Sequence, residues 1–254
     1  MRPAGMRYAL HAEWTKLRTA PGTVWLVLAV IALTVAMSAA VTAAARCPAG
    51  GCAVDAARTS LSGVELGQAV VAILAVLAIG GEYSTGMIRI TLTAMPRRTI
   101  VLAAKAVVLS GIVLVAGTIS VLASLLAGRL ILPGPHPSLE DGSVLRATVG
   151  SVLYLVLIAL LSLGTAIAVR DPATAIGIVL GLLYLFPIVI HAVSDPDWQR
   201  HLEQVGPMSA GLTVQATTHL SGLPIGPWAG LGVLATWAAA ALLSAGLLLH
   251  LRDA

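Results

Sequence analysis

The chain has 254 residues, of which 58% are hydrophobic and only 10% are charged, and its mean hydropathy is +0.95. Soluble domains carry about 25% charged residues, so this composition excludes a water-soluble globule, and it excludes a disordered chain, which is rich in charge and poor in apolar residues. The net charge of +4 does not indicate nucleic-acid binding, because the basic residues form no patch interleaved with aromatic residues.

Six stretches are long and apolar enough to cross a hydrocarbon core about 30 Å thick, which takes about 20 residues of helix. They are predicted at 23–45, 64–80, 100–127, 147–169, 173–193 and 229–250. Backbone groups find no partner in lipid, and the stretches lack the two-residue alternation of a membrane barrel, so all six are expected to be helices. The first exceeds the length of a signal-peptide core and is expected to be retained. The prediction is an all-α integral membrane protein with one membrane domain over 1–254.

Before the first span, residues 6–20 are predicted to form an amphipathic helix lying along the membrane surface. One apolar and one polar face recur at helical spacing: Met6, Leu10, Trp14 and Leu17 against Arg7, His11, Thr15 and Arg18. Glu13 can pair with Lys16 one turn on, and Pro21-Gly22 breaks the helix before the first span. A plain interfacial anchor is the alternative interpretation.

Cys47 and Cys52 flank a Pro-Ala-Gly-Gly turn after the first span. If that turn faces an oxidising compartment, the two thiols are candidates for a small disulfide loop, and two free thiols are the equal alternative. No metal site is expected, because two sulfurs without a neighbouring His or carboxylate fall short of a tetrahedral set of ligands.

The segment between the second and third spans is predicted to be a short helix held against the membrane. Gly80-Gly81 is expected to end the second span, and Ile88, Leu92 and Met95 supply an apolar face before Pro96. Such a helix can present polar groups to a partner, although a structural elbow is equally compatible with the pattern. Lys105, five residues into the third span, is expected to extend back to the membrane surface.

Catalytic motifs are missing from the sequence: it has no H-E-x-x-H, no G-x-S-x-G and no P-loop. His191, Ser194 and Asp195 lie close together at the end of the fifth span, but a triad is recognised by geometry and not by local proximity, so capping and anchoring are expected of them. The following segment, 194–228, can lie at the outer interface or re-enter the membrane, and the sequence leaves both open.

Lys and Arg side chains are enriched on the cytoplasmic side of membrane proteins. With the N-terminus inside, ten of the fifteen fall on that side: Arg2, Arg7, Lys16, Arg18, Arg89, Arg97, Arg98, Lys105, Arg170 and Arg252. Both termini are therefore predicted to be cytoplasmic.

Three segments together resemble a known family. They are Glu13-Trp14-Thr15-Lys16-Leu17-Arg18, the pattern from Glu82 through Gly86, Arg89, Leu92 and Pro96 to Arg98 followed by Lys105, and the end at Trp237 and Leu251-Arg252-Asp253-Ala254. They resemble actinobacterial permease subunits of ABC exporters of the type-two (type V fold) group, and the resemblance covers the whole chain.

The resemblance implies a permease that pairs with a second copy or a sister permease in the bacterial cytoplasmic membrane. Two P-loop ATPase subunits would bind beneath it and hold the ATP and Mg, so no cofactor is expected in this chain. It implies that contact with the ATPase is made by Glu13, Lys16, Arg18, Glu82, Gly86, Arg89, Pro96, Arg97 and Arg98. A partner for Glu82 is expected at Lys16 or Arg18.

The resemblance assigns no substrate contacts. The scarcity of charge inside the spans favours an apolar or amphiphilic cargo. Two other functions stay open at this point: a membrane anchor or sensor subunit that binds the ATPase without transporting, and an intramembrane enzyme, for which no active site is visible.

Overall fold

A computed structural model describes residues 3–45, 55–84, 87, 98–132 and 141–251. All regular structure in these ranges is helical, and six of the described helical stretches are long and apolar enough to cross a membrane. The long helices are α2 (Pro21–Ala44), α4 (Val64–Ser84), α6 (Arg98–Ile131), α7 (Gly142–Val169), the continuous run of α8 (Pro172–Leu180), η1 (Gly181–Leu185) and α9 (Phe186–His191), and α12 (Pro227–Leu251). The predicted all-α fold with six membrane helices is confirmed.

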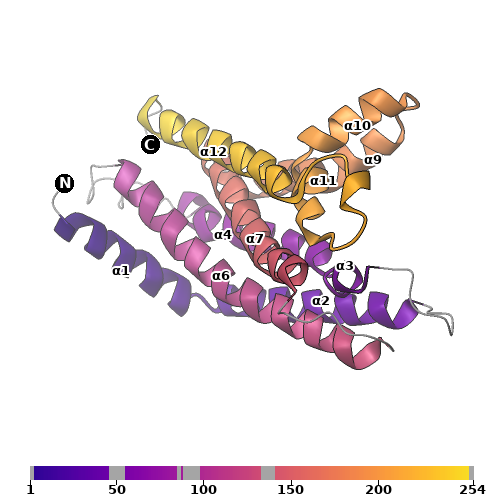
Figure 1. The fold of residues 1–254 in the computed structure, drawn as a ribbon. Helices are drawn as coiled ribbons and strands as arrows, with labels where there is room; N and C mark the ends of the chain where they lie inside the picture. Colours follow the sequence, from indigo (N-terminus) through magenta and orange to yellow (C-terminus); the bar gives the residue numbers. More distant parts are fainter. Residues whose placement is uncertain (1–2, 46–54, 85–86, 88–97, 133–140, 252–254) are drawn as a thin grey trace.

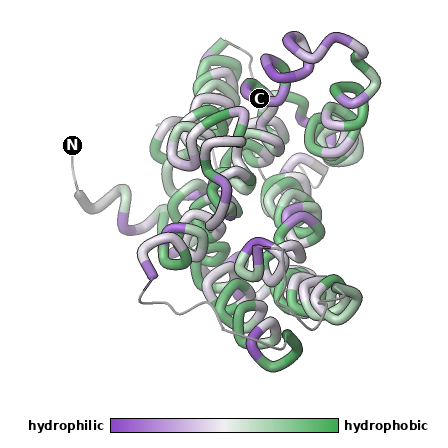
Figure 2. Tube along the Cα trace, turned by 45° about the vertical axis from the view of Figure 1, so that its right-hand side comes forward, coloured by the Kyte–Doolittle hydropathy of each residue, from purple (hydrophilic) through white to green (hydrophobic). Residues whose placement is uncertain are grey.

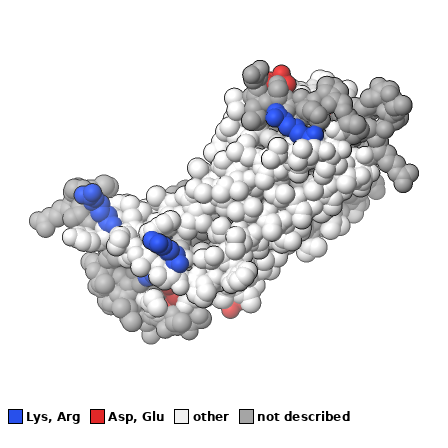
Figure 3. Space-filling model, turned by 90° about the horizontal axis from the view of Figure 1, so that it is seen from below, with Lys and Arg blue, Asp and Glu red and all other residues white. Residues whose placement is uncertain are grey.

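Helix α7 lies at the centre of the bundle (Figure 1), between α4 and α6 on one side and α12 on the other. Its fully buried Tyr154, Leu155 and Ile158 belong to the main hydrophobic core. The described parts of the two chain ends lie at the same end of the bundle. On the face seen in Figure 3, charged side chains lie near the two ends and an uncharged band separates them, as expected of a surface in contact with lipid.

The expectation that Gly80-Gly81 ends the second span is wrong, because α4 continues through both glycines to Ser84. A side chain at Gly80 would place its Cβ 2.8 Å from the Pro172 side chain. The glycine is therefore used for close approach of α4 to the start of α8, and not as a helix end. This extension carries Glu82 on the last turn of a helix.

Helix α1 (Pro3–Thr19) precedes the first span and leaves the bundle to one side (Figure 2). Its protein-facing side carries the buried Ala9, Glu13 and Leu17 and packs on the start of α6. The predicted polar face of Arg7, His11, Thr15 and Arg18 is exposed. Trp14, predicted on the apolar face, is 49% exposed, because the side of α1 that packs on the protein is centred on Glu13.

The fifth span is interrupted by η1, a π-helical segment, with Pro187 following in the first turn of α9. Proline supplies no backbone N–H donor, and π-helical segments are frequent at functional positions in helices. The segment carries Tyr184, whose hydroxyl donates a hydrogen bond to the backbone carbonyl of Glu65 on α4. The fifth span is thereby joined to the second.

The region after the fifth span re-enters the bundle. Residues 196–222, called here the re-entrant segment, comprise α10 (Pro196–Val205), α11 (Pro207–Gly211), η2 (Leu212–Gln215) and η3 (Leu220–Gly222). The Trp237 indole N–H donates to the Val205 carbonyl at 2.9 Å, and Trp237 lies ten residues after the first residue of α12. At a rise of 1.5 Å per residue, the contact with Val205 lies about 15 Å along α12 from the first residue of that helix. The segment therefore packs back against α7 and α12, and its position relative to the membrane stays a prediction.

A short helix, α3 (Ala56–Ser60), closes the end of the bundle opposite the chain ends. Its N-cap residue Asp55 accepts hydrogen bonds from the backbone N–H groups of Thr217 and Thr218 at 2.6 and 3.1 Å, and from the Thr217 hydroxyl at 2.6 Å. We call this set of contacts the Asp55 latch. It fastens the returning end of the re-entrant segment to the connection between the first two spans.

Candidate functional site

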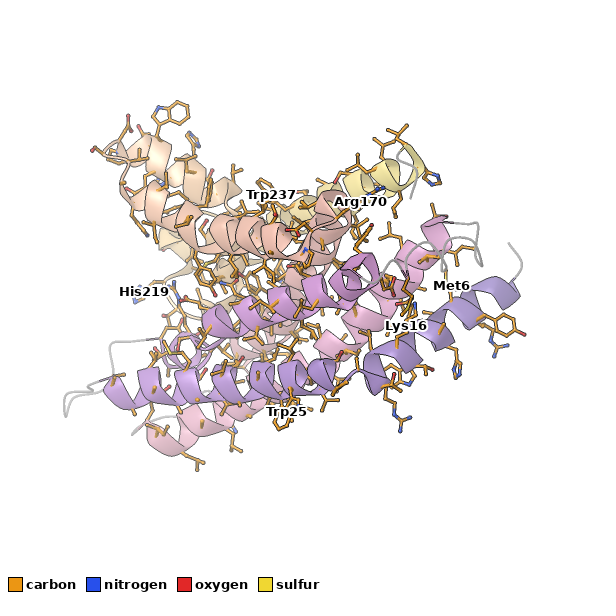
Figure 4. All side chains as sticks on the ribbon, turned by 180° about the vertical axis from the view of Figure 1, so that it is seen from behind. Met6, Lys16, Trp25, Arg170, His219 and Trp237 are labelled. Carbon is orange, nitrogen blue, oxygen red and sulfur yellow. The ribbon has the colours of Figure 1, made fainter. Side chains whose placement is uncertain are left out.

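Four charged side chains meet where α1, α4 and α6 converge, at the end of the bundle that holds the chain ends (Figure 4). Lys16 Nζ lies 3.2 Å from Glu13 Oε1 and 2.9 Å from Glu82 Oε1. Lys105 Nζ lies 2.7 Å from Glu13 Oε2 and 2.6 Å from Glu82 Oε1. The four residues form a closed ring of alternating charge, which we call the charge cluster.

The charge cluster is largely withdrawn from solvent. Lys105, Glu13 and Glu82 are 4%, 5% and 6% exposed, and only the Lys16 side chain, at 34%, reaches solvent to a larger extent. Burying charges carries a desolvation penalty that mutual attraction repays only with good geometry. Here each ammonium contacts two carboxylates and the formal charges cancel, so the ring is electrically balanced without a further ion.

Electrostatics within the ring keep Lys16 charged. Partial burial alone would lower the pKa of Lys16, but its hydrogen bond to Glu82 and the negative charges of Glu13 and Glu82 outweigh burial and raise the pKa above its usual value of 10.5. Glu82 Oε2 is buried and has no hydrogen-bond partner among the described residues. That oxygen can accept a further donor if the surroundings of the ring change.

The structure brings together three of the residues that the sequence singled out and adds a fourth. Glu13, Lys16 and Glu82 meet, and it is Lys16 that contacts Glu82, while Arg18 is exposed at the end of α1. Lys105, which by its length can extend back toward the membrane surface, has its ammonium in the ring, in contact with Glu13 and Glu82. Gly86, Arg89, Pro96 and Arg97, and the cysteines Cys47 and Cys52, lie outside the described residues, and Arg98 is the first residue of α6.

Two members of the ring lie on either side of one connection between membrane helices. Glu82 sits on the last turn of α4 and Lys105 in the second turn of α6, so they flank the connection 85–97 on both sides. Glu13 and Lys16 join α1 to both helices. The ring therefore joins α1 to the ends of two membrane helices through ion pairs.

The residues considered for chemistry have structural roles. Asp195 accepts hydrogen bonds from the backbone N–H groups of Asp197 and Trp198 and caps α10, and the His191 ring contacts Gln199. No group of three His, Cys, Asp or Glu able to hold a metal occurs in the described part of the chain.

A family model for ABC-2 family transporter proteins matches residues 9–188, which is more than half of the chain and includes all four members of the charge cluster. The chain belongs to the ABC-2 transporter family. No curated protein matches the chain. This ABC-2 permease is a multi-pass membrane protein and a transport subunit, and permeases of this family lack an ATPase site of their own and normally pair with an ATP-binding subunit. The family predicted from the sequence is confirmed, while the actinobacterial source stays a prediction.

Proposed function

We propose that this ABC-2 permease is the membrane half of an exporter in the bacterial cytoplasmic membrane. It moves an apolar or amphiphilic substrate outward, and two copies of a separate P-loop ATPase bind ATP and Mg and hydrolyse the ATP. The permease pairs with a second copy of itself or with a sister permease. It transmits work and does no bond chemistry.

The observation that carries the proposal is the charge cluster. It ties α1, the end of α4 and the start of α6 into one unit beside the connection 85–97. In our proposal this unit receives the movement of the ATPase subunits when they close on ATP, and the attached helices reorient as rigid bodies to open the outward side. Glu82 has the leading role, because its Oε1 contacts both lysines.

The exposed face of α1 supplies a contact surface for the ATPase in this scheme. Arg7, His11, Thr15 and Arg18 face away from the bundle, and Glu13 and Lys16 connect the opposite side of the helix to the cluster. Gly86, Arg89, Pro96, Arg97 and Arg98 are proposed to complete the surface from the neighbouring connection and the first residue of α6. The chain ends and the charge cluster are then cytoplasmic, and the re-entrant segment faces outward.

The test uses the permease and its ATPase reconstituted together in vesicles. We expect ATP-dependent accumulation of fluorescent amphiphiles in inside-out vesicles, since that is the direction of export. Glu82→Gln should leave the complex assembled and abolish stimulation of ATP hydrolysis by the transported amphiphile. Asp171→Asn is the matched control, because Asp171 is exposed at the same end of the bundle and only caps α8. Normal transport by Glu82→Gln would remove the charge cluster from the mechanism, and accumulation only in right-side-out vesicles would exclude export.

A further inference from the structure

A pocket of about 310 Å³ lies between α9 and the re-entrant segment, with the start of α4 and α3 at its side. Four of its lining residues are ionisable: Arg58, Glu65, His191 and Glu203. Most of the other lining residues are apolar, Ile190 and Leu212 among them, and two carry hydroxyl groups, Ser209 and Thr213. The volume is at the lower end of the range of small-molecule sites, about 300–1,000 Å³, and the mixture of lining groups suits a small amphiphile.

The pocket lies beside the helical bundle. Glu203 is two residues before Val205, whose carbonyl accepts a hydrogen bond from Trp237 on α12, and Glu65 is in the first turn of α4. Helix α10 turns Gln199 and Glu203 toward the protein and leaves Trp198 and Val205, 64% and 55% exposed, on the outside. Carboxylates from two different helices therefore face one pocket.

The charges in the pocket are not neutralised by one another. Among the described residues neither Glu65 nor Glu203 forms an ion pair, and Glu203 accepts only a hydrogen bond from Gln199 Nε2 at 3.3 Å. Arg58 is near enough to act on the charge of Glu65. The lining holds two carboxyl groups and one guanidinium, so acidic groups outnumber the permanent cation.

We propose that this pocket binds an amphiphile that carries a protonated amine, with the ammonium group beside Glu203 and Glu65 and the hydrocarbon part against Ile190 and Leu212. The inference rests on the proposed function, for which it names the class of cargo at the outward end of the path. The same chemistry can be presented by the amino headgroup of a lipid, which the experiment below separates from a free cargo.

The test measures binding to the full chain, without ATPase, in phosphatidylcholine nanodiscs, with empty nanodiscs to correct for partition into lipid. Dodecylammonium, dodecanol and dodecanoate share one chain length and differ in head charge. We expect dodecylammonium to bind about tenfold more tightly than the other two, because only its head group can donate charge-assisted hydrogen bonds to the two carboxyl groups. Equal affinity for dodecanol overturns the proposal without any variant.

Variants locate the site. Glu203→Gln should weaken dodecylammonium binding about tenfold, and Glu65→Gln should weaken it in the same direction. Asp197→Asn is the control on the same helix, outside the pocket lining. Unchanged affinity in both Glu variants would contradict the site.

A lipid headgroup is separated from free cargo by nanodiscs that contain phosphatidylethanolamine. Loss of dodecylammonium binding by competition in these nanodiscs assigns the site to a lipid headgroup, and unaffected binding assigns it to free cargo. Because no ATP is used, failure here is distinct from failure of transport.

Discussion

Lys105 is the residue on which the charge cluster depends most, because it is the most buried of the four and contacts both carboxylates. The pairing of Glu13 with Lys16 follows from their spacing on one helix. The participation of Lys105 in the cluster does not follow from spacing, because the contact requires α1 to pack on the start of α6. A lysine inside an apolar stretch was the available signal in the sequence, and extension to the surface was the interpretation that a lone cation favours.

Lys105→Met should lower the stability of the permease by about 3–5 kcal/mol, because it leaves buried carboxylate charge with only Lys16 as a partner. The measurement is the thermal unfolding midpoint of the purified chain. The double variant Lys105→Met/Glu82→Gln removes one charge of each sign, and it should lose clearly less than the sum of the two single variants. Simple additivity would show that the two side chains do not interact.

Asp55 gives the α3 end of the bundle a defined response to acid. Burial would raise the pKa of Asp55, but hydrogen bonds from Thr217 and from the backbone N–H groups of Arg58 and Thr218 outweigh burial and lower the pKa below its usual value of 3.8. A lowered pKa means that the folded state favours the carboxylate. The stabilisation is therefore complete at pH values well above 3.8 and is lost as the pH falls through the lowered pKa.

We expect Asp55→Asn to lower the thermal midpoint at pH 7 by an amount equivalent to about 1–2 kcal/mol, since the carboxylate is partly exposed. The difference from the unchanged protein should stay constant down to about pH 5 and shrink below that. Thermal scans of both proteins from pH 7 to pH 3 measure this. A difference that grows on acidification has the wrong sign and would refute the latch as described.

Among the elements, the re-entrant segment is held by close approach of backbones. A Cβ at Gly230 would lie 2.0 Å from the Ala210 carbonyl oxygen, and a Cβ at Gly150 would lie 2.1 Å from the Val214 side chain. At Gly230 a side chain would require the neighbouring backbone to move, and at Gly150 it would require the Val214 side chain to move. They explain how apolar helices α7 and α12 admit a short, partly irregular segment between them, since non-helical backbone at membrane depth must be buried in protein.

Gly230→Ala should destabilise the permease by about 1–3 kcal/mol through overpacking. Gly232→Ala is the matched control, because it lies two residues further along α12 with nothing within 4 Å of its Cβ, and helix propensity alone should make it neutral or slightly stabilising. Limited proteolysis after heating should show earlier cleavage near the re-entrant segment only in Gly230→Ala. Equal behaviour of the two variants would mean that the close contact carries no cost.

At the scale of the whole molecule, the two ends of the bundle carry different machinery. One end holds the charge cluster, the chain ends and Arg170, and the other holds α3, the Asp55 latch and His219 (Figure 4). In our proposal the first end meets the ATPase and the second releases cargo. The distribution of Lys and Arg between the loops supports this orientation.

Labelling of single cysteines tests the orientation. In a background with Cys47→Ser and Cys52→Ser, Ser221→Cys should react with a membrane-impermeant maleimide in intact cells, because Ser221 is exposed at the α3 end. Thr15→Cys, exposed on α1, should react only after permeabilisation. The reverse pattern would invert the orientation, and reaction of both in intact cells would contradict the six-span topology.

The amino-acid sequence predicts the class of the protein, the number of membrane helices and their approximate positions, because burial in lipid is imposed on each apolar stretch separately and is visible in local composition. It also indicated Glu13, Lys16 and Glu82 as a group. Only the tertiary structure decided that Lys105 closes the ring, that 196–222 re-enters the bundle, and that Asp55 meets Thr217. These contacts join residues 92, 32 and 162 positions apart, and polar partners at such distances are chosen by helix packing, which local patterns do not encode.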